Sequence, residues 1–191
     1  VKTNHERSYG HLHAEAIAEN IKLKTENPMF YLTLPSPVGD LLLTHNGEAL
    51  TGLTMPHEQH GQHTAPQSDW QHDAAVQTPI FAAATKQLTA YFAGQLQHFD
   101  LPLAPQGTPF QQQVWRALCE IPYGHTRSYG WQAQAINNPK AVRAVGGANG
   151  RNPIGIVIPC HRVIGANGSL TGYGGGLPNK QWLLAHERHY A

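Results

Sequence analysis

Short apolar runs separated by turn-forming residues dominate the first half of the 191-residue chain. The runs lie at 30–34, 41–44 and 49–53. Between them stand Pro35-Ser36-Pro37 and His45-Asn46-Gly47, which are typical turn sequences. This pattern predicts an antiparallel meander of three strands.

Helical spacing follows the meander. Apolar side chains recur on one face between Ile80 and Ala93, at Ala84, Leu88, Tyr91 and Phe92. A short strand is predicted around His98–Leu101. These elements predict a small α/β domain over residues 28–103, made of an antiparallel sheet, a helix and an outgoing linker.

The second half, residues 104–191, begins with a strong helix start. Thr108 is an N-cap residue type and Pro109 suits the first helical turn. Apolar positions then follow on one face at Phe110, Val114, Ala117, Leu118 and Ile121. Two further helices, over 129–136 and 140–150, flank the break Asn137-Asn138-Pro139 and predict a helix-turn-helix.

Three elements complete the predicted second domain. The apolar run between Pro153 and Pro159 predicts a buried strand that ends at Cys160. Asn167-Gly168 predicts a hairpin over 163–171. A last helix is expected over 178–186, with Trp182, Leu183 and Ala185 available to the core. The whole of 104–191 is therefore predicted to be mostly α-helical.

Two polar segments stand apart from this scheme. Residues 1–27 are predicted to be a tail or a loosely docked helix, and 56–77 to be a long loop. The loop contains His57, His60 and His63 beside Glu58, a spacing at which a metal ion could bind. A solvated histidine-rich loop is the favoured interpretation, because no cysteine accompanies them. No metal site is expected.

Composition excludes several classes of protein. With 40% hydrophobic and 13% charged residues, the chain is typical of a globular protein. It has no apolar run of membrane-spanning length, and its first residues lack the pattern of a secretory leader. Two cysteines, Cys119 and Cys160, make no disulfide framework, which favours a reducing, cytoplasmic location.

Charge is distributed unevenly between the halves. Residues 1–103 hold five basic and ten acidic residues, whereas 104–191 hold eight basic and two acidic residues. A basic second half indicates a polyanionic partner such as DNA or RNA, although chance clustering of surface charge would give the same count.

Cys160 is the candidate nucleophile. It precedes His161 and Arg162, and a cationic neighbourhood favours the reactive thiolate. The imidazole could accept the thiol proton, and Glu187 could orient the imidazole. Alone, a cysteine beside a histidine is more often a small buried residue. Cys119 is interpreted as incidental.

The helix predicted over 140–150 is nearly bare of large side chains. Its small residues are Ala141, Ala144, Gly146, Gly147 and Ala148. Each glycine destabilises a helix by about 1 kcal/mol, so another interaction is expected to offset this loss of stability. Close approach to a partner and tight internal packing both provide one. Arg143 is the single large side chain among them.

Several motifs, in order, resemble one family, the methylated-DNA–protein-cysteine methyltransferases or O6-alkylguanine-DNA alkyltransferases, of the bacterial Ogt type. Residues 159–165 resemble the family's active-site motif, 138–148 resemble its recognition helix and 182–187 resemble its closing helix. Thr108-Pro109-Phe110-Gln111 with Val114-Trp115 resembles the helix after the linker. The resemblance implies a ribonuclease H-like first domain and a winged-helix-like second domain.

The resemblance also implies DNA repair. The alkyl group of O6-alkylguanine in double-stranded DNA would pass directly and irreversibly to Cys160, so each molecule would react once. O4-methylthymine is left open as a second substrate. No cofactor is expected, because the damaged DNA is itself the donor. The protein would act as a monomer, bind the minor groove and flip the damaged base.

Individual roles follow from the same resemblance. His161, with water and Glu187, would prepare the thiolate, and Asn152 would stabilise the turn. Tyr129 would donate a proton to the leaving base, with Lys180 assisting. The base pocket would be formed by Tyr129, Asn149, Val163, Tyr173 and the loop from Gly174. Main-chain groups of Cys160, Val163 and Gly174 would bond the guanine.

Contacts to DNA are assigned in the same way. Arg143 would enter the base stack, and Tyr129 would press on the target phosphate. The small residues that would permit close approach are Ala141, Ala144, Gly146 and Gly147.

Related classes of protein remain distinguishable. Alkyltransferase-like proteins replace the nucleophile, which is retained here as Cys160. Adaptive-response regulators add a zinc domain with four cysteines, and residues 1–103 contain none. A non-catalytic DNA-binding regulator and a cysteine hydrolase using Cys160, His161 and Glu187 stay open as alternatives.

Overall fold

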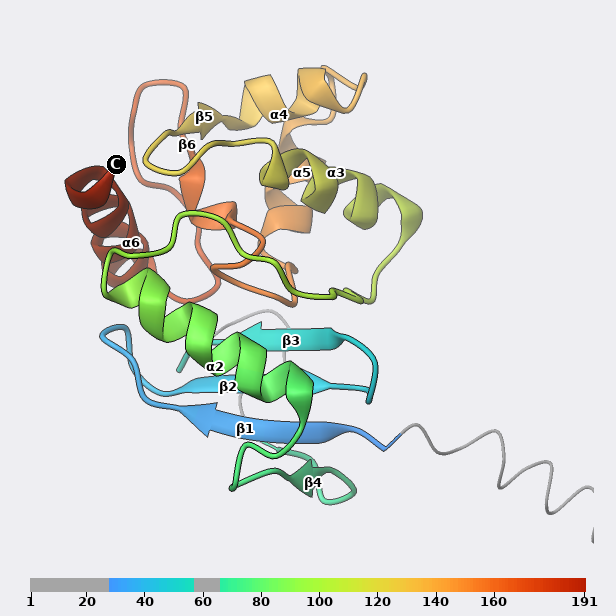
Figure 1. Ribbon diagram of the computed structural model, residues 1–191. Helices are drawn as coiled ribbons and strands as arrows, with labels where there is room; N and C mark the ends of the chain where they lie inside the picture. The colour runs from blue at the N-terminus through green and yellow to red at the C-terminus, as the bar shows by residue number, and fades with distance from the viewer. Residues whose placement is uncertain (1–27, 57–65) are drawn as a thin grey trace, which may run out of the picture.

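The computed structural model describes residues 28–56 and 66–191. Within them, a four-stranded sheet and one helix form the first part of the chain, and the remaining helices pack above it (Figure 1). The predicted tail at 1–27 and the cluster of His57, His60 and His63 lie outside the described residues. The predicted domain boundary near residue 103 remains a prediction.

The meander is confirmed. Strands β1 (Phe30–Leu34), β2 (Leu41–His45) and β3 (Leu50–Thr54) pair antiparallel in that order. A two-residue strand, β4 (Gln71–His72), adds to the free edge of β1 in parallel orientation. The sheet is therefore mixed rather than purely antiparallel, because part of the predicted loop pairs with β1.

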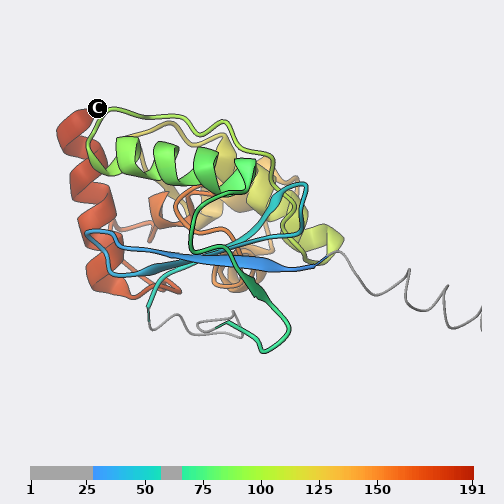
Figure 2. The ribbon, with the colours of Figure 1, turned by 60° about the horizontal axis from the view of Figure 1, so that its bottom comes forward.

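Helix α2 (Pro79–Phe92) covers one face of this sheet (Figure 2). It begins with proline in its first turn and buries Ile80, Phe81, Ala84, Leu88 and Tyr91. The strand predicted at His98–Leu101 is wrong. The chain instead bridges to β3 a little later, where Leu50 exchanges backbone hydrogen bonds with Pro102 and Ala104. Pairing with an existing strand edge, which is a tertiary event, sets that position.

The helices of the second half form as predicted. They are α3 (Pro109–Cys119), α4 (Tyr129–Ala135), α5 (Val142–Asn149) and α6 (Leu177–Tyr190). At the start of α3, Thr108 and Gln111 form a reciprocal capping box. Helices α4 and α5 pack on α3 and on each other, which is the arrangement of a helix-turn-helix. In α6, Leu183 is buried but Ala185 is exposed, contrary to expectation.

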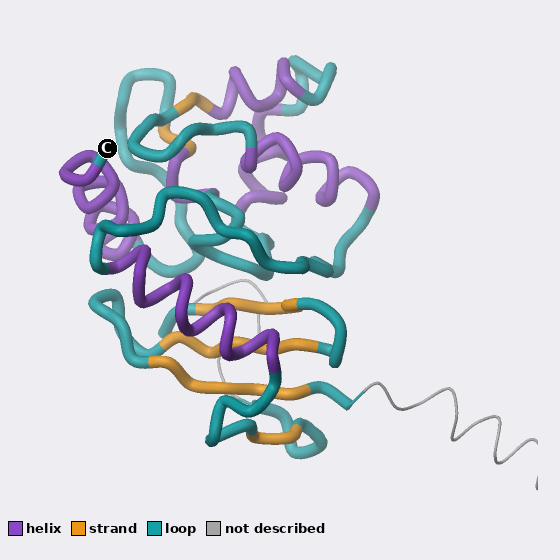
Figure 3. The backbone as a smooth tube through the Cα atoms, viewed as in Figure 1, coloured by secondary structure: helices purple, strands orange, loops and turns teal. Residues whose placement is uncertain are grey.

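The stretch between α5 and α6 is mainly loop and turn (Figure 3). Residues 153–159 do not form the predicted strand. They are mostly buried, as predicted, since Ile154, Ile156 and Ile158 are buried. Their backbone bonds locally, from Val157 N to Gly155 O and from Ile158 N to Ile154 O. Such tight turns bend the chain out of an extended path.

The predicted hairpin over 163–171 is also corrected. Strand β6 (Val163–Ile164) pairs in parallel with β5 (Arg127–Ser128), so its partner lies before α4. The Asn167-Gly168 turn does form, closed by the bond from Gly165 N to Ser169 O. A long-range partner therefore replaces the local one.

One edge of the first sheet reaches the turn that precedes Cys160. Leu53 of β3 bridges to Ile154, donating its N–H to Pro153 O and accepting from Gly155 N. The neighbouring Gly52 leaves room for Thr44 of β2, because an added Cβ would lie 2.5 Å from Thr44 Oγ1. The first sheet thus fixes the position of the candidate nucleophile's loop.

Within residues 28–56 and 66–191, no helix is both long and apolar enough to cross a bilayer. The same residues contain no group of three or more His, Cys, Asp or Glu side chains placed to hold a metal ion.

The buried histidine of β2 leads to a prediction about acid stability. His45 accepts from Gly47 N through Nδ1 and contacts Thr78 Oγ1 through Nε2, and Thr78 donates to Asp73. Protonation would place a hydrogen on Nδ1, so that two N–H donors, those of Nδ1 and Gly47, would face each other and the hydrogen bond would be lost. Burial lowers the pKa of His45, and the charge of Asp73 only partly opposes this. The neutral ring is therefore the folded form.

Because the folded-state pKa of His45 is lowered, its contribution to stability is complete above about pH 6.5 and is lost as the pH falls. We expect the urea midpoint to fall between about pH 7.5 and about pH 5.5. His45→Asn keeps an acceptor for Gly47 but cannot titrate, so it should lose less over that range. Equal losses in the two proteins would contradict the prediction.

Candidate active site

Cys160 lies at the start of a single 3-10 turn, Cys160–Arg162, and is 8% exposed. The side chain of Asn152 stabilises the approach to it. Its Nδ2 donates to Ile158 O at 2.7 Å and to the Cys160 Sγ at 3.2 Å, while its Oδ1 accepts from Ile154 N. A hydrogen-bond donor at sulfur favours the thiolate over the thiol.

His161 is completely buried and is paired with Glu187. Its Nε2 lies 2.8 Å from Glu187 Oε1. An ionised carboxylate only accepts, so Nε2 bears the proton and Nδ1 has the lone pair. Nδ1 is buried and has no hydrogen-bond partner among the described residues. Burial, together with the charges of Arg162 and Lys180, lowers the pKa of His161 although Glu187 raises it, so the ring is a neutral base.

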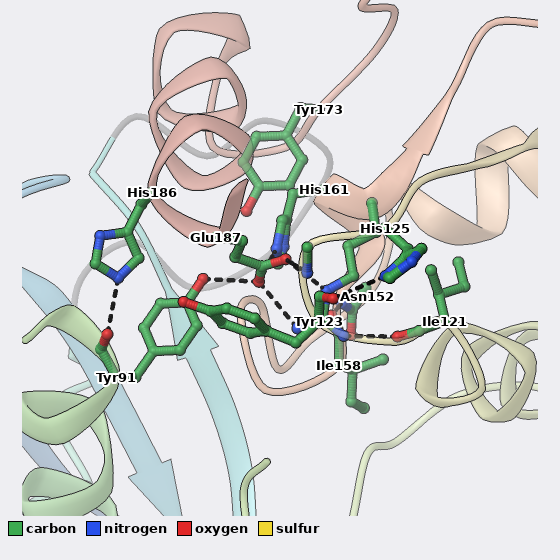
Figure 4. A network of polar contacts seen from close by, with 12 residues as sticks. Tyr91, Ile121, Tyr123, His125, Asn152, Ile158, His161, Tyr173, His186 and Glu187 are labelled. Carbon is green, nitrogen blue, oxygen red and sulfur yellow. Dashed lines mark hydrogen bonds and ion pairs between the residues drawn. The ribbon is translucent and has the colours of Figure 1, made fainter. Parts of the chain in front are cut away.

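Glu187 receives hydrogen bonds on both carboxylate oxygens. Arg162 donates to it from Nε and Nη2, both at 2.9 Å, and Gly124 N donates at 3.2 Å. The hydroxyl of Tyr91, from α2, donates at 2.9 Å (Figure 4). Burial opposes ionisation, but the bonds and charges of His161 and Arg162 hold the pKa of Glu187 at about 2. Glu187 is thus a fixed anion.

Lys180 and Tyr129 both contact the loop that follows β6. Lys180 is fully buried, and its Nζ donates to Val163 O at 2.6 Å and Thr171 O at 2.9 Å. Burial lowers its pKa to about 8, although the charge of Cys160 raises it. The Tyr129 hydroxyl donates to Thr171 O at 3.2 Å. Both side chains therefore stabilise this loop; their proton-transfer roles remain predictions.

The predicted pocket residues differ in their burial and in their distance along the chain from Cys160. Val163 is buried next to the Cys160 turn, and the half-buried Tyr173 presents its ring to His161 edge-on, with centroids 6.5 Å apart. Gly174 follows Tyr173 in the same loop. Asn149 is buried, and its amide exchanges two hydrogen bonds with Gln132. That pairing was not visible from the sequence.

Helix α5 exposes the face that was predicted to bind DNA. Arg143, Ala144 and Gly147 are exposed, whereas Ala141 and Gly146 are half-buried. An added Cβ would meet no atom closer than 3.8 Å at Gly146 or 3.4 Å at Gly147, which is ordinary contact. Internal packing therefore does not require these glycines, which favours close approach to a partner.

Comparison with known proteins decides the family. Residues 29–105 match "6-O-methylguanine DNA methyltransferase, ribonuclease-like domain", and residues 109–189 match the DNA binding domain of the same description. A protein of Mycolicibacterium paratuberculosis named methylated-DNA–protein-cysteine methyltransferase is 52% identical over 161 residues, 84% of this chain and 93% of the relative. The chain belongs to the 6-O-methylguanine DNA methyltransferase family.

Other members of this methyltransferase family agree in sequence and in structure. A protein of the same name from Methanosarcina acetivorans is 51% identical over 83% of this chain and 98% of its own length. The crystal structure of Mycobacterium tuberculosis OGT in complex with DNA matches with a TM-score of 0.76 and 50% identity, covering 85% of this chain and 94% of that one. The predicted family and fold class are confirmed.

Two residues of this methyltransferase's site escaped the sequence analysis. Arg162 was identified only as a cation beside Cys160, yet its guanidinium binds Glu187 and Ile121 O. Tyr91 was assigned only to the core of its helix, and it lies 96 positions before Glu187. A polar atom on a core position gives no periodic signal, so neither contact could be read from the chain.

Proposed function

We propose that this methyltransferase repairs DNA by moving the alkyl group of O6-alkylguanine directly onto Sγ of Cys160. One observation supports this most strongly. Glu187 fixes the Nε2–H tautomer of His161, which leaves a buried basic Nδ1 on the residue next to the buried cysteine. A nucleophile, a base and an orienting carboxylate are thereby assembled.

The reaction we propose is a single displacement. His161 Nδ1 accepts the Cys160 proton, directly or through one water, and Glu187 stabilises the imidazolium that forms. The thiolate attacks the alkyl carbon, so that an S–C bond forms while the C–O6 bond breaks. The bonding electron pair returns to the guanine ring, which takes one proton from Tyr129 in our proposal. The Tyr129 phenolate then regains a proton through solvent as the His161 imidazolium gives its proton up. Alkylated Cys160 and unmodified guanine are the products.

The bond formed is a thioether, which unlike a thioester has no facile hydrolysis step. Each protein molecule is therefore consumed by one reaction, and no cofactor is required. This chemistry needs a reduced cysteine, and neither Cys119 nor Cys160 forms a disulfide in the described part of the chain. We accordingly propose that the protein works in the reducing environment of the cytoplasm. Because one chain contains Cys160, His161 and Glu187, we propose that it works as a monomer.

We propose that α5 enters the minor groove of double-stranded DNA. The exposed, nearly bare face of this helix permits close approach, and eight of the ten charged residues of 104–191 are basic. Arg143 would replace the flipped guanine in the base stack. The base would then enter a pocket formed by Tyr129, Val163, Tyr173, Asn149 and the loop at Gly174.

Arg143→Ala should impair repair of duplex DNA while sparing the chemistry. We expect the rate constant on duplex O6-methylguanine to fall by about tenfold or more, because extrusion of a base costs a few kcal/mol. Reaction with free O6-benzylguanine, which needs no flipping, should change little. Single-turnover rates on both substrates measure this.

Arg188→Ala is the matched control for Arg143→Ala, since it removes an exposed arginine of α6 and therefore an equal charge. It should leave both rates close to those of the wild type. Equal losses on duplex and free base in Arg143→Ala would contradict a role in flipping.

Protein mass tests the proposed function itself. The protein is incubated with an oligonucleotide containing one O6-methylguanine and then analysed by mass spectrometry. We expect a stoichiometric gain of one methylene mass, found on the peptide that contains Cys160. Bound DNA with an unchanged protein mass would favour a non-catalytic sensor and refute the proposal.

A further inference from the structure

The side chain of Tyr91 connects the first domain to the candidate active site. Tyr91 is fully buried near the end of α2, and its hydroxyl donates to Glu187 Oε1 at 2.9 Å. Burial and the charge of Glu187 raise its pKa well above the ordinary value for tyrosine. The phenol therefore stays protonated and remains a donor at any working pH.

Tyr91 shares its acceptor atom with His161. Glu187 Oε1 is contacted by the Tyr91 hydroxyl, by His161 Nε2 at 2.8 Å and by Arg162 Nη2 at 2.9 Å. A carboxylate oxygen offers only about two lone-pair directions, so three donors on one oxygen compete. The Tyr91 hydroxyl therefore limits both the rotation of the carboxylate and the negative charge that Oε1 offers to His161.

Tyr91 is itself held in place from α6. His186 contacts the backbone carbonyl of Tyr91 through Nε2 at 2.8 Å, and its ring centroid lies 5.4 Å from that of Tyr91. The rings of Phe99 and Tyr123 pack on the phenol at 5.3 and 6.1 Å. Figure 4 shows the Glu187 carboxylate between this phenol and His161. The hydroxyl thus reaches Glu187 in a preformed geometry.

We propose that Tyr91 is a positioning residue for alkyl transfer, which acts through Glu187 to set the orientation and basicity of His161. The inference rests on the proposed function of Cys160 and His161. It gives the first domain a part in the chemistry, since α2 supplies one donor of the network and α6 supplies Glu187.

The direction of the effect follows from the charges around His161. Glu187 faces the ring and favours its protonation, whereas Arg162 and Lys180 oppose it. Loss of the Tyr91 hydroxyl leaves Glu187 Oε1 with one donor fewer, so the carboxylate attracts the imidazolium more strongly. The pKa of His161 then rises, so that protonation removes the base at a higher pH than in the wild type.

Tyr91→Phe removes only the hydroxyl and tests the proposal in the full-length protein. Because the carboxylate is then less restrained, we expect the single-turnover rate on O6-methylguanine duplex to fall by about threefold to tenfold, as the loss of one hydrogen bond allows. The acidic limb of the pH–rate profile should move to higher pH. In ¹⁵N NMR spectra, the titration of the His161 ring should move in the same direction, which can be measured without any DNA.

Tyr123→Phe is the matched control. The Tyr123 hydroxyl is buried and bonds to no described residue, and its ring packs on that of Tyr91. The two variants therefore remove the same group from neighbouring rings. We expect Tyr123→Phe to keep the wild-type rate, pH profile and His161 titration, while unfolding midpoints report any loss of stability in both.

The outcomes separate the positioning role from the proposed function. If the wild type takes up methyl groups but Tyr91→Phe matches Tyr123→Phe in rate, pH profile and His161 titration, the positioning role is refuted alone. A lower unfolding midpoint without a shift of the His161 titration also refutes it, since packing alone would then account for Tyr91. A wild type that takes up no methyl group refutes the proposed function, whereas the His161 titration still tests the network.

Discussion

Cys160→Ser is expected to keep its mass unchanged after incubation with an oligonucleotide that contains O6-methylguanine. A serine hydroxyl does not ionise near neutral pH, so no anion is available to displace the base. The fold should survive, because oxygen replaces sulfur without adding bulk to a buried turn. Mass spectrometry measures alkylation, and a gel-shift assay with the same duplex measures binding.

Cys119→Ser is the control, because it removes the other cysteine. Cys119 lies at the surface at the end of α3, its partly buried thiol donates to Trp115 O at 3.6 Å, and this partial burial raises the pKa of the thiol. Such a thiol is a poor nucleophile, so this variant should react like the wild type. A methyl group found on Cys160→Ser would require another acceptor and would overturn the mechanism.

Glu187→Gln is expected to damage both chemistry and stability. Arg162 is 7% exposed and pairs with Glu187 through two donors, so its charge would be left buried without a counter-ion. Loss of one partner of a buried ion pair costs about 3–5 kcal/mol. The alkyl-transfer rate should fall by about a hundredfold, because the amide neither fixes the His161 tautomer nor stabilises imidazolium.

Urea unfolding and single-turnover kinetics measure these two losses separately, at a temperature where the variant remains folded. Glu120→Gln, at an exposed carboxylate beside the end of α3, provides the control and should change neither. A folded Glu187→Gln protein with wild-type kinetics would show that His161 does not depend on this carboxylate.

Local signals predicted the elements whose bonds are local. Thr108, Pro109 and Gln111 form their capping box within a single turn, so the start of α3 could be read from four residues. The meander is likewise formed by neighbours in the chain. The run over 153–159 was misread because apolar composition reports burial, whereas its path depends on Asn152 and on distant Leu53.

The candidate site likewise combines residues that the sequence predicted with contacts that only the structure shows. Cys160, His161 and Arg162 are adjacent in sequence, Glu187 was predicted to orient the imidazole, and resemblance to a family added Asn152 and Lys180. Lys180 is buried and bonded to the carbonyl oxygens of Val163 and Thr171, two contacts that the sequence did not predict. The amide pairing of Asn149 with Gln132 joins two helices. No pattern along the chain predicts a side-chain hydrogen bond between two helices.

The sequence by itself determined the family and the helix-turn-helix, and it pointed to Cys160 as the candidate nucleophile, because motifs and helical spacing are properties of neighbouring residues. Only the tertiary structure decided how the nucleophile is surrounded. Tyr91 and Gly124 bond to Glu187 from 96 and 63 positions away, and only packing of α2 and the α3–β5 turn against α6 brings them there. Hydrogen bonds act over about 3 Å, so folding, and not sequence order, selects the donors around Glu187.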